Sequence, residues 1–359
     1  MGTVRDQPPG QGALWRAHLE RHAGSLGFSA VGVAGLDLAE DERHLEAWLA
    51  AGRHGTMAFM AMHGRRRSRP QLLRPGTLRV ISARMPYFPR DARSAPDVLA
   101  DRQLGYVSRY ALGRDYHKFM RLQLQKLARS LAQVAGPHGF RVYVDSAPVL
   151  EKALARNAGL GWIGKHTNLI AREAGSWFFL GEVFTDLPLV VDRQASAHCG
   201  SCTACIPACP TGAIVAPYQL DARRCIAYLT IELQGPIPIE LRPLIGNRIY
   251  GCDDCQLACP WNSHAQAAGH PDFKARHGLD APRLAHLLGW TAEDFESRMA
   301  GSAIYRVGYS HWLRNVAVAL GNGLPGEEEI AALRARADDP SPLVREHVLW
   351  ALERLAEKR

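Results

Sequence analysis

The sequence has no hydrophobic run long enough to cross a lipid bilayer. A transmembrane helix needs about 20 consecutive apolar residues, and polar or charged residues interrupt every apolar segment of this 359-residue chain before that length. The start of the chain is polar, and Pro8, Pro9 and Gly10 stand where a secretory signal would have an apolar stretch. We therefore expect a protein that stays in the cytoplasm and has no contact with a membrane.

The chain also lacks the excess of polar residues that marks disordered proteins. Apolar residues make up 47% of it, and its length is sufficient for two or three compact units that each bury a core. The formal net charge is +8, which favours a polyanionic partner but does not by itself establish one.

Helical and strand-like patterns alternate over residues 1–192, which predicts an α/β domain. Apolar residues recur at helical spacing from Met120 to Val134, and Gly136 and Pro137 end that pattern. Residues 140–145 alternate between apolar and polar side chains, as a strand does, and residues 177–184 have the composition of a mostly buried strand.

The last part of the chain, residues 271–359, is predicted to be a helical region, with a helical pattern from about Ala281. Residues 313–321 (LRNVAVALG) are echoed by residues 344–352 (VREHVLWAL), which is typical of the paired helices of a HEAT-like repeat. Two copies are few for a solenoid, so two amphipathic helices that close the domain are the alternative interpretation.

Eight cysteines in a chain without a secretory signal favour metal binding over disulfides. The first four of them, followed by Pro210, have the spacing C-x2-C-x2-C-x3-C-P of bacterial ferredoxins. In that run the first three cysteines bind one 4Fe-4S cluster, and the fourth binds the other cluster. The pattern predicts a ferredoxin-like domain over residues 193–270.

A second group of cysteines has only the last three positions of the same run and needs one more ligand. Cys225 is the cysteine that remains, so eight ligands are available for two clusters. A pair of zinc sites is the alternative, since C-x2-C also suits tetrahedral zinc, but zinc does not require the C-x3-C-P ending. The predicted ligand sets are Cys199, Cys202, Cys205 and Cys259 for one cluster, and Cys209, Cys225, Cys252 and Cys255 for the other.

Two adjacent clusters transfer single electrons, so they imply an external electron donor and an acceptor held by the α/β domain. No standard cofactor motif identifies that acceptor. Residues 159–164 fit G-x-G-x-x-G by spacing, but they follow the helix-like residues 149–157 and do not follow a strand directly. We interpret them as a glycine-rich loop.

Several longer motifs occur in one order along the chain. They are GRDYH at 113–117, VDSAPVLE at 144–151, AGLGWIGKH at 158–166, the ferredoxin run, RCIAYLT at 224–230 and GNRIYGCDDC at 246–255. Together they resemble the epoxyqueuosine reductase family, and the match extends over nearly the whole chain.

The resemblance implies a cobalamin-binding α/β domain above the ferredoxin-like clusters. Members of the family reduce epoxyqueuosine to queuosine at the wobble position of tRNA, which is the last step of queuosine biosynthesis. The implied partners are therefore the anticodon loop of a tRNA and an external electron donor. We expect the protein to be a monomer.

The resemblance also implies the roles of several residues. Asp145 corresponds to the proton donor for the leaving oxygen, which requires its pKa to rise by roughly two to three units above the usual value of about 3.9. A helix-capping Asp145 is the alternative. No histidine is assigned as a cobalt ligand. The implied cobalamin contacts are Arg67, Ser108, Asp145, Leu169, Leu180 and Asp253.

A basic stretch lies between Gly64 and Arg93, with nine arginines and one acidic residue, Asp91. Arginine forks suit phosphate oxygens, and Tyr87, Phe88 and Tyr106 are candidates for stacking on unpaired bases. We expect this stretch to contact RNA. Solvated loop arginines, of which one or two hold the cofactor, are the alternative.

Two other functions compete with tRNA modification. A ferredoxin-type electron-transfer subunit would need no cobalamin, whereas a reductive dehalogenase-like enzyme would use cobalamin on another substrate. Exported enzymes of the latter class carry an N-terminal twin-arginine signal. Arg65 and Arg66 lie far from the start and precede no apolar segment, so they do not form one.

Overall fold

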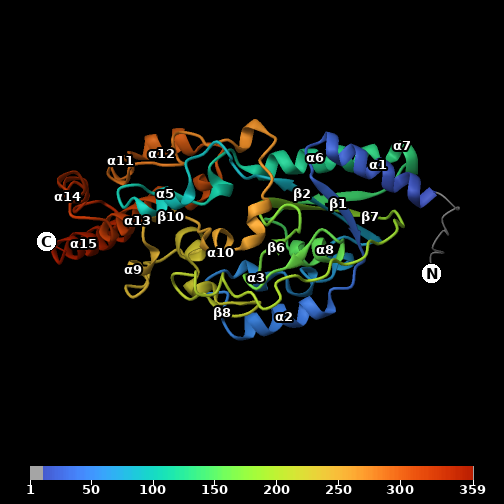
Figure 1. Ribbon diagram of the computed structural model, residues 1–359, viewed down its shortest axis with the longest axis horizontal. Helices are drawn as coiled ribbons and strands as arrows, with labels where there is room; N and C mark the ends of the chain where they lie inside the picture. Colours follow the sequence, from blue (N-terminus) through green and yellow to red (C-terminus); the bar gives the residue numbers. More distant parts are fainter. Residues whose placement is uncertain (1–10, 359) are drawn as a thin grey trace.

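The computed structural model describes residues 11–358. Most of the polar start on which the cytoplasmic expectation rests, residues 1–10, lies outside the described residues. The molecule is elongated, with a sheet and its helices at one end and a group of helices at the other (Figure 1). No helix within residues 11–358 is both long and apolar enough to span a membrane.

A four-stranded antiparallel sheet forms the first part of the fold. Its order is β1 (Ala30–Ala34), β2 (Arg79–Pro86), β7 (Phe178–Thr185) and β4 (Phe140–Tyr143). β2 and β7 pair over their whole lengths, and β4 pairs with β7 from Phe140 to Tyr143. The strands predicted at 140–145 and 177–184 are therefore present as β4 and β7.

Helices cover both faces of this sheet. On one face lie α1 (Gln11–Ser25), α6 (Tyr116–Ser130) and α7 (Ala132–Ala135). The predicted apolar stripe of α6 packs into the core through Met120, Leu124 and Leu127, and Asp115 caps the helix by accepting the His117 backbone N–H at 3.0 Å. The other face packs against α8 (Glu151–Asn157).

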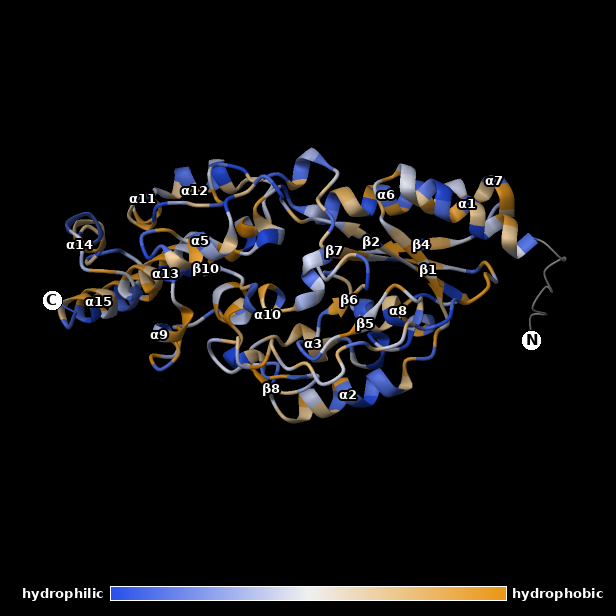
Figure 2. Cartoon of the chain, in the orientation of Figure 1, coloured by the Kyte–Doolittle hydropathy of each residue, from blue (hydrophilic) through white to orange (hydrophobic). Residues whose placement is uncertain are grey.

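Short helices connect the first two strands. They are α2 (Ala39–Ala50), α3 (Phe59–Met62), the 3-10 turn η1 (Gly64–Arg66) and α4 (Pro70–Leu73). Figure 2 shows apolar residues concentrated along the strands and polar residues prominent on α2.

The described residues also form three two-stranded ribbons, two of which join neighbouring segments. β5 (Trp162–Ile163) pairs with β6 (Leu169–Ile170), and β8 (Ile214–Ala216) pairs with β9 (Gln219–Leu220). The third ribbon is parallel and joins β3 (Tyr106–Val107) to β10 (Arg248–Tyr250). It brings the segment that precedes α6 beside the second cysteine group. The remaining short helices of the middle part are α5 (Ala95–Ala100), α9 (Arg242–Ile245) and α10 (Asp254–Leu257).

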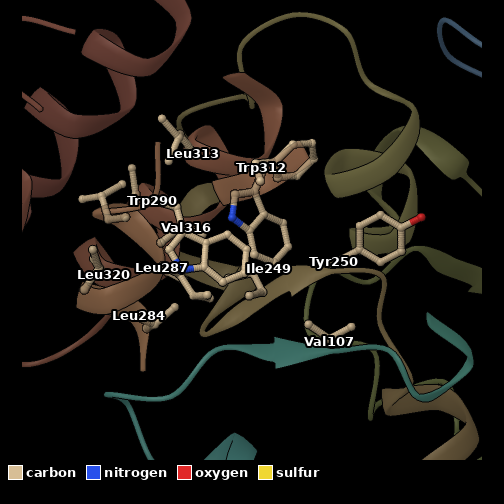
Figure 3. Close-up of a cluster of buried hydrophobic side chains, with 14 of the residues drawn as sticks. Val107, Ile249, Tyr250, Leu284, Leu287, Trp290, Trp312, Leu313, Val316 and Leu320 are labelled. Carbon is tan, nitrogen blue, oxygen red and sulfur yellow. The ribbon is translucent and has the colours of Figure 1, made fainter. Parts of the chain in front are cut away.

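The end of the chain is helical, as expected. It contains α11 (Leu284–Leu288), α12 (Ala292–Met299), α13 (Tyr309–Asn322), α14 (Glu327–Arg334) and α15 (Pro342–Ala356). The two similar segments lie in α13 and α15, which pack against each other. The Trp290 and Trp312 rings stack at 5.8 Å in the core between these helices and β10 (Figure 3). The HEAT-like description itself stays a prediction.

Two buried polar side chains of α13 fasten this helix to the cysteine-bearing part. The Arg314 guanidinium donates to the Leu229 and Leu233 carbonyls at 2.8 and 2.7 Å. The Asn315 amide donates to the Thr230 and Ile249 carbonyls at 2.8 and 3.0 Å. Helix α13 therefore supports both the π-helical turn η4 (Tyr228–Glu232), which follows Cys225, and the strand β10, which precedes Cys252.

Candidate functional site

Four of the cysteines line one small cavity although they come from separate parts of the chain. They are Cys199, Cys202, Cys205 and Cys259. The Lys165 ammonium fixes the first loop by donating to the Gly200 and Cys202 carbonyls at 2.7 and 2.9 Å. This cavity contains the members of the first predicted ligand set.

Of the other four cysteines, Cys255 lies on α10, and Cys225 and Cys252 pack against one apolar cluster. Burial raises the pKa of the Cys255 thiol. Cys252 precedes the same turn and donates to the Asp254 carboxylate at 2.8 Å. All eight cysteines are free of disulfides. The assignment of each cysteine to a cluster stays a prediction.

No three His, Cys, Asp or Glu side chains in residues 11–358 are placed to hold a single metal ion. Burial raises the thiol pKa of Cys205, Cys225, Cys252 and Cys259 as well. Cysteines bind iron as thiolates, so these thiols must lose their protons when iron binds.

Two buried N–H groups beside the first cavity have no partner. His166 lines the cavity, and its Nδ1 accepts the Asn168 backbone N–H at 3.1 Å, so the proton of the neutral ring is on Nε2. Burial lowers the pKa of His166 to about 4, which keeps the ring neutral. The buried His166 Nε2 and Trp162 Nε1 have no hydrogen-bond partner among the described residues. Acceptor atoms within the cavity, such as cluster sulfur, would satisfy donors of this kind.

Asp145 lies directly after β4 in an unusual conformation. Its φ of +45° is in the left-handed region, which aspartate tolerates better than most residues. The Asp145 backbone N–H donates to Glu151 Oε1 at 2.7 Å. Its side chain is 57% exposed, so the carboxylate is accessible to a substrate.

His117 connects Asp145 to a second carboxylate. His117 Nε2 lies 3.0 Å from Asp145 Oδ2, and His117 Nδ1 lies 2.6 Å from Asp115 Oδ1. Arg306 Nη2 lies 3.5 Å from the other oxygen of Asp115. An imidazole between two carboxylates donates to both only as the imidazolium.

The two neighbouring carboxylates favour the protonated form of His117. Burial alone would lower the pKa of His117, but hydrogen bonds and charge from Asp115 and Asp145 raise it overall. Burial alone would raise the pKa of Asp145, but the hydrogen bond and charge of His117 lower it overall. The expected elevation of the Asp145 pKa is therefore absent in this protein, and its role as proton donor stays a prediction.

Two more carboxyl groups lie behind Asp145. Burial and the Asp145 charge raise the pKa of Glu151 to about 8. Burial and the Glu151 charge raise the pKa of Glu182 well above its usual value, and Ser82 Oγ donates to Glu182 Oε2 at 2.5 Å. Neither glutamate was predicted from the sequence. Glu151 ends the VDSAPVLE motif, and Glu182 is an acidic residue within a predicted buried strand, so each position could have been recognised.

Comparison with known proteins shows the family. Residues 67–146 match the family described as epoxyqueuosine reductase QueG, DUF1730, and residues 198–262 match the 4Fe-4S double cluster binding domain. The epoxyqueuosine reductase of Xanthomonas campestris pv. campestris is 59% identical, over 94% of this chain and 95% of its own length. The chain belongs to the epoxyqueuosine reductase family. The Escherichia coli epoxyqueuosine reductase is 55% identical over 93% of the chain and 88% of its own length.

Solved epoxyqueuosine reductases share the fold. One structure contains a tRNA-Tyr epoxyqueuosine-modified stem loop and matches with a TM-score of 0.86 and 29% identity, over 96% of this chain and 91% of its own. The Bacillus subtilis epoxyqueuosine reductase, with an aspartate catalytic loop swung out of the active site, matches over the same shares with a TM-score of 0.85 and 28% identity.

The polar residues among the predicted cobalamin contacts of this epoxyqueuosine reductase family member differ in whether their side chains already have hydrogen-bond partners in the protein. Ser108 Oγ and the Tyr106 hydroxyl donate to the buried Asp253 carboxylate at 2.6 and 2.7 Å, so Ser108 and Asp253 use these side chains on each other. Arg67 is buried, donates to the Phe59 carbonyl at 2.8 Å and leaves its Nε without a partner.

The two predicted leucine contacts lie on β6 and β7. Leu169 is buried, whereas Leu180 is only half-buried although it lies inside the central strand β7. Lys152, which the sequence analysis did not single out, is exposed to solvent, yet burial lowers the pKa of its ammonium. That combination is expected of a side chain that lines a recess within the protein.

The basic stretch is less uniform than its composition suggests. Arg69 pairs with Glu42 at 2.7 Å, and Arg84 is buried against Glu173. The prediction that Tyr87 and Tyr106 stack on bases is wrong, because only 7% and 1% of these residues is exposed. Both rings belong to the protein interior, which composition alone does not reveal.

Proposed function

We propose that this protein reduces epoxyqueuosine to queuosine at the wobble position of tRNA. The observation that carries the proposal is the 59% identity, over nearly the whole length of both chains, to a protein named epoxyqueuosine reductase. The similarity to a solved relative in complex with an epoxyqueuosine-modified tRNA stem loop supports tRNA as the partner.

Two 4Fe-4S clusters and cobalamin are the cofactors of this proposal. The unpartnered Arg67 Nε and the half-exposed Leu180 inside a central strand fit a bound organic group. We assign the cobalamin site to Arg67, Ser108, Asp145, Leu169, Leu180 and Asp253, the last through its backbone. Cobalamin held there would supply the reducing chemistry for the epoxide-bearing ring, and clusters held by the eight cysteines would pass it single electrons from an external donor.

The side chains around Asp145 supply protons. Conversion of an epoxide to an alkene consumes two electrons and two protons and releases water. In the proposed sequence, Asp145 protonates the leaving oxygen and recovers the proton from the His117 imidazolium, 3.0 Å away. The Glu151 carboxyl, with a pKa raised to about 8, holds a second proton near neutral pH.

Asp145 is held by the backbone bond to Glu151 and by side-chain contacts with His117 and Tyr116. A related structure has its aspartate catalytic loop swung out of the active site. We infer that residues 145–148 of this chain move in the same way when tRNA enters or leaves.

Mass spectrometry of nucleosides tests the proposal. Epoxyqueuosine-containing tRNA is incubated anaerobically with cluster-reconstituted protein and a low-potential reductant, with and without cobalamin. We expect queuosine only when cobalamin is present. Conversion without cobalamin would remove that cofactor from the proposal. A protein with full iron and bound cobalamin that produces no queuosine would refute the substrate and leave electron transfer as the function.

A further inference from the structure

An open groove of about 660 Å³ lies beside β4, which we call the β4-edge groove. In the four-stranded sheet β4 is the last strand, so its outer edge has no strand partner within that sheet. Residues 146–148, which directly follow Asp145, line part of the groove. Figure 2 shows β4 beneath α6, which contributes part of the wall.

None of the acidic residues that the structure describes lines the groove, whereas three arginines and one histidine do. They are His63, Arg66, Arg121 and Arg141. The three arginines are exposed, and none of them has an ion pair within residues 11–358. Nearby Arg65 and Arg69, in contrast, pair with Glu42. The groove therefore carries positive charge that the protein does not neutralise.

A buried hydroxyl adds an independent observation. Tyr143 lines the groove and is only 7% exposed. Its hydroxyl has no hydrogen-bond partner among the described residues, although a buried polar group without a partner costs about 1 to 3 kcal/mol. A ligand that offers an acceptor oxygen would satisfy it.

We propose that the β4-edge groove binds the sugar-phosphate backbone of the tRNA strand next to the nucleotide that Asp145 acts on. This inference rests on the proposed function. Three unpaired guanidiniums along an open groove match a series of phosphates, whereas a cofactor with one phosphate would leave most of them unpaired. The shared wall at residues 146–148 makes the groove continuous with the catalytic loop.

Fluorescence anisotropy with an unmodified anticodon stem-loop RNA tests this groove. We expect the double variant Arg121→Ala/Arg141→Ala to bind about tenfold more weakly at moderate salt. The slope of log affinity against log salt concentration should become shallower by about two, one for each lost phosphate contact. Tyr143→Phe keeps the ring and should weaken binding by about threefold through the lost hydroxyl. The matched control is Arg43→Ala on α2, an exposed arginine outside the groove, which should bind as the wild type does.

The outcomes separate this inference from the proposed function. Normal RNA affinity in the double variant would refute the assignment of the groove as an RNA-binding site, even if the wild type produces queuosine. Weaker cobalamin binding with normal RNA affinity would overturn it too, because the ligand would then be the phosphate of the cofactor. Loss of RNA affinity in the double variant, with a wild type that binds RNA but produces no queuosine, would support the groove and refute the function. Circular dichroism and iron content verify that each variant is folded.

Discussion

At the scale of single residues, His117 matters most for proton supply, because its two ring nitrogens contact Asp115 and Asp145. The raised pKa of His117 keeps the imidazolium present above pH 6.5, the ordinary value for histidine. As the pH rises through that raised pKa, the proton is lost and the Asp145–His117 pair has none to donate. Activity should therefore fall on the alkaline side.

Replacing His117 with glutamine tests this link. Glutamine can still donate a hydrogen bond to Asp145 but cannot carry the proton. We expect His117→Gln to lose roughly 100-fold in turnover near neutral pH, with a smaller loss in acid, where Asp145 protonates directly. A pH profile parallel to that of the wild type would refute the relay.

Asp145 itself is tested by Asp145→Asn, because asparagine also tolerates the left-handed conformation at φ +45°. The amide has no acidic proton of comparable strength, so turnover should drop by about 100-fold or more. Iron and cobalamin contents should match the wild type. Near-normal turnover would exclude Asp145 as the proton donor.

His166 provides a prediction for the first cluster. If its unpartnered Nε2–H donates to cluster sulfur, His166→Phe removes a bond that stabilises the reduced, more negative state. The midpoint potential of that cluster should become more negative, as measured by redox titration with electron paramagnetic resonance. The control is His198→Phe, an exposed histidine that bonds Ser196 at 3.0 Å, and it should shift the potential less.

Single residues also show what the sequence could predict. Asp145 and all eight cysteines stand within contiguous motifs, so spacing and resemblance identify them without a structure. Asp115 stands two residues before His117 in the same motif, whereas Arg306 lies far away in the chain, and only the fold places it beside them. Composition likewise did not reveal that Tyr106 is buried, because burial depends on packing and not on residue type.

At the scale of elements, α13 connects the helical tail to the cysteine-bearing segment. Asn315→Leu removes three buried hydrogen bonds: the Thr230 and Ile249 carbonyls lose their amide donor, and Arg314 Nε loses its acceptor. We expect a loss of about 2 to 4 kcal/mol in the free energy of unfolding, together with a lower iron content, because the turn after Cys225 loses its support. Thermal unfolding and iron analysis measure both effects.

The control for that variant lies in the same tail. Leu349 on α15 is 50% exposed, so Leu349→Ala should change the free energy of unfolding by about 0.5 kcal/mol or less. A normal iron content in a destabilised Asn315→Leu protein would show that α13 supports the fold but not the second cluster site.

The sequence predicted individual elements better than their partners. Alternation marks residues 140–145 as a strand, and helical spacing marks α6, because both patterns are local. Antiparallel pairing within the sheet and the parallel pairing of β3 with β10 join residues that are distant in the chain. No local pattern contains that information, so the fold class was predictable while the topology was not.

At the scale of the whole molecule, the regions should differ in their dependence on iron. Residues 199–213 contain turns and lack a helix, whereas the sheet has its own core on both faces. Removal of iron with a chelator should therefore increase amide hydrogen exchange first in residues 198–213, and only weakly in β2 and β7. Equal loss of protection in the sheet would show that the clusters stabilise the entire chain.

The pairing of β3 with β10 also has a consequence for the order in which the protein is made. Residues 106–107 leave the ribosome long before residues 248–250 exist, because synthesis adds only about 5 to 20 residues per second. The hydrogen bond from Ser108 to Asp253 therefore cannot form until Asp253 has been synthesised. The two sides of the predicted corrin site meet only after the first ferredoxin run has been translated. Translation thus gives iron access to the earlier cysteines before the chain closes around them.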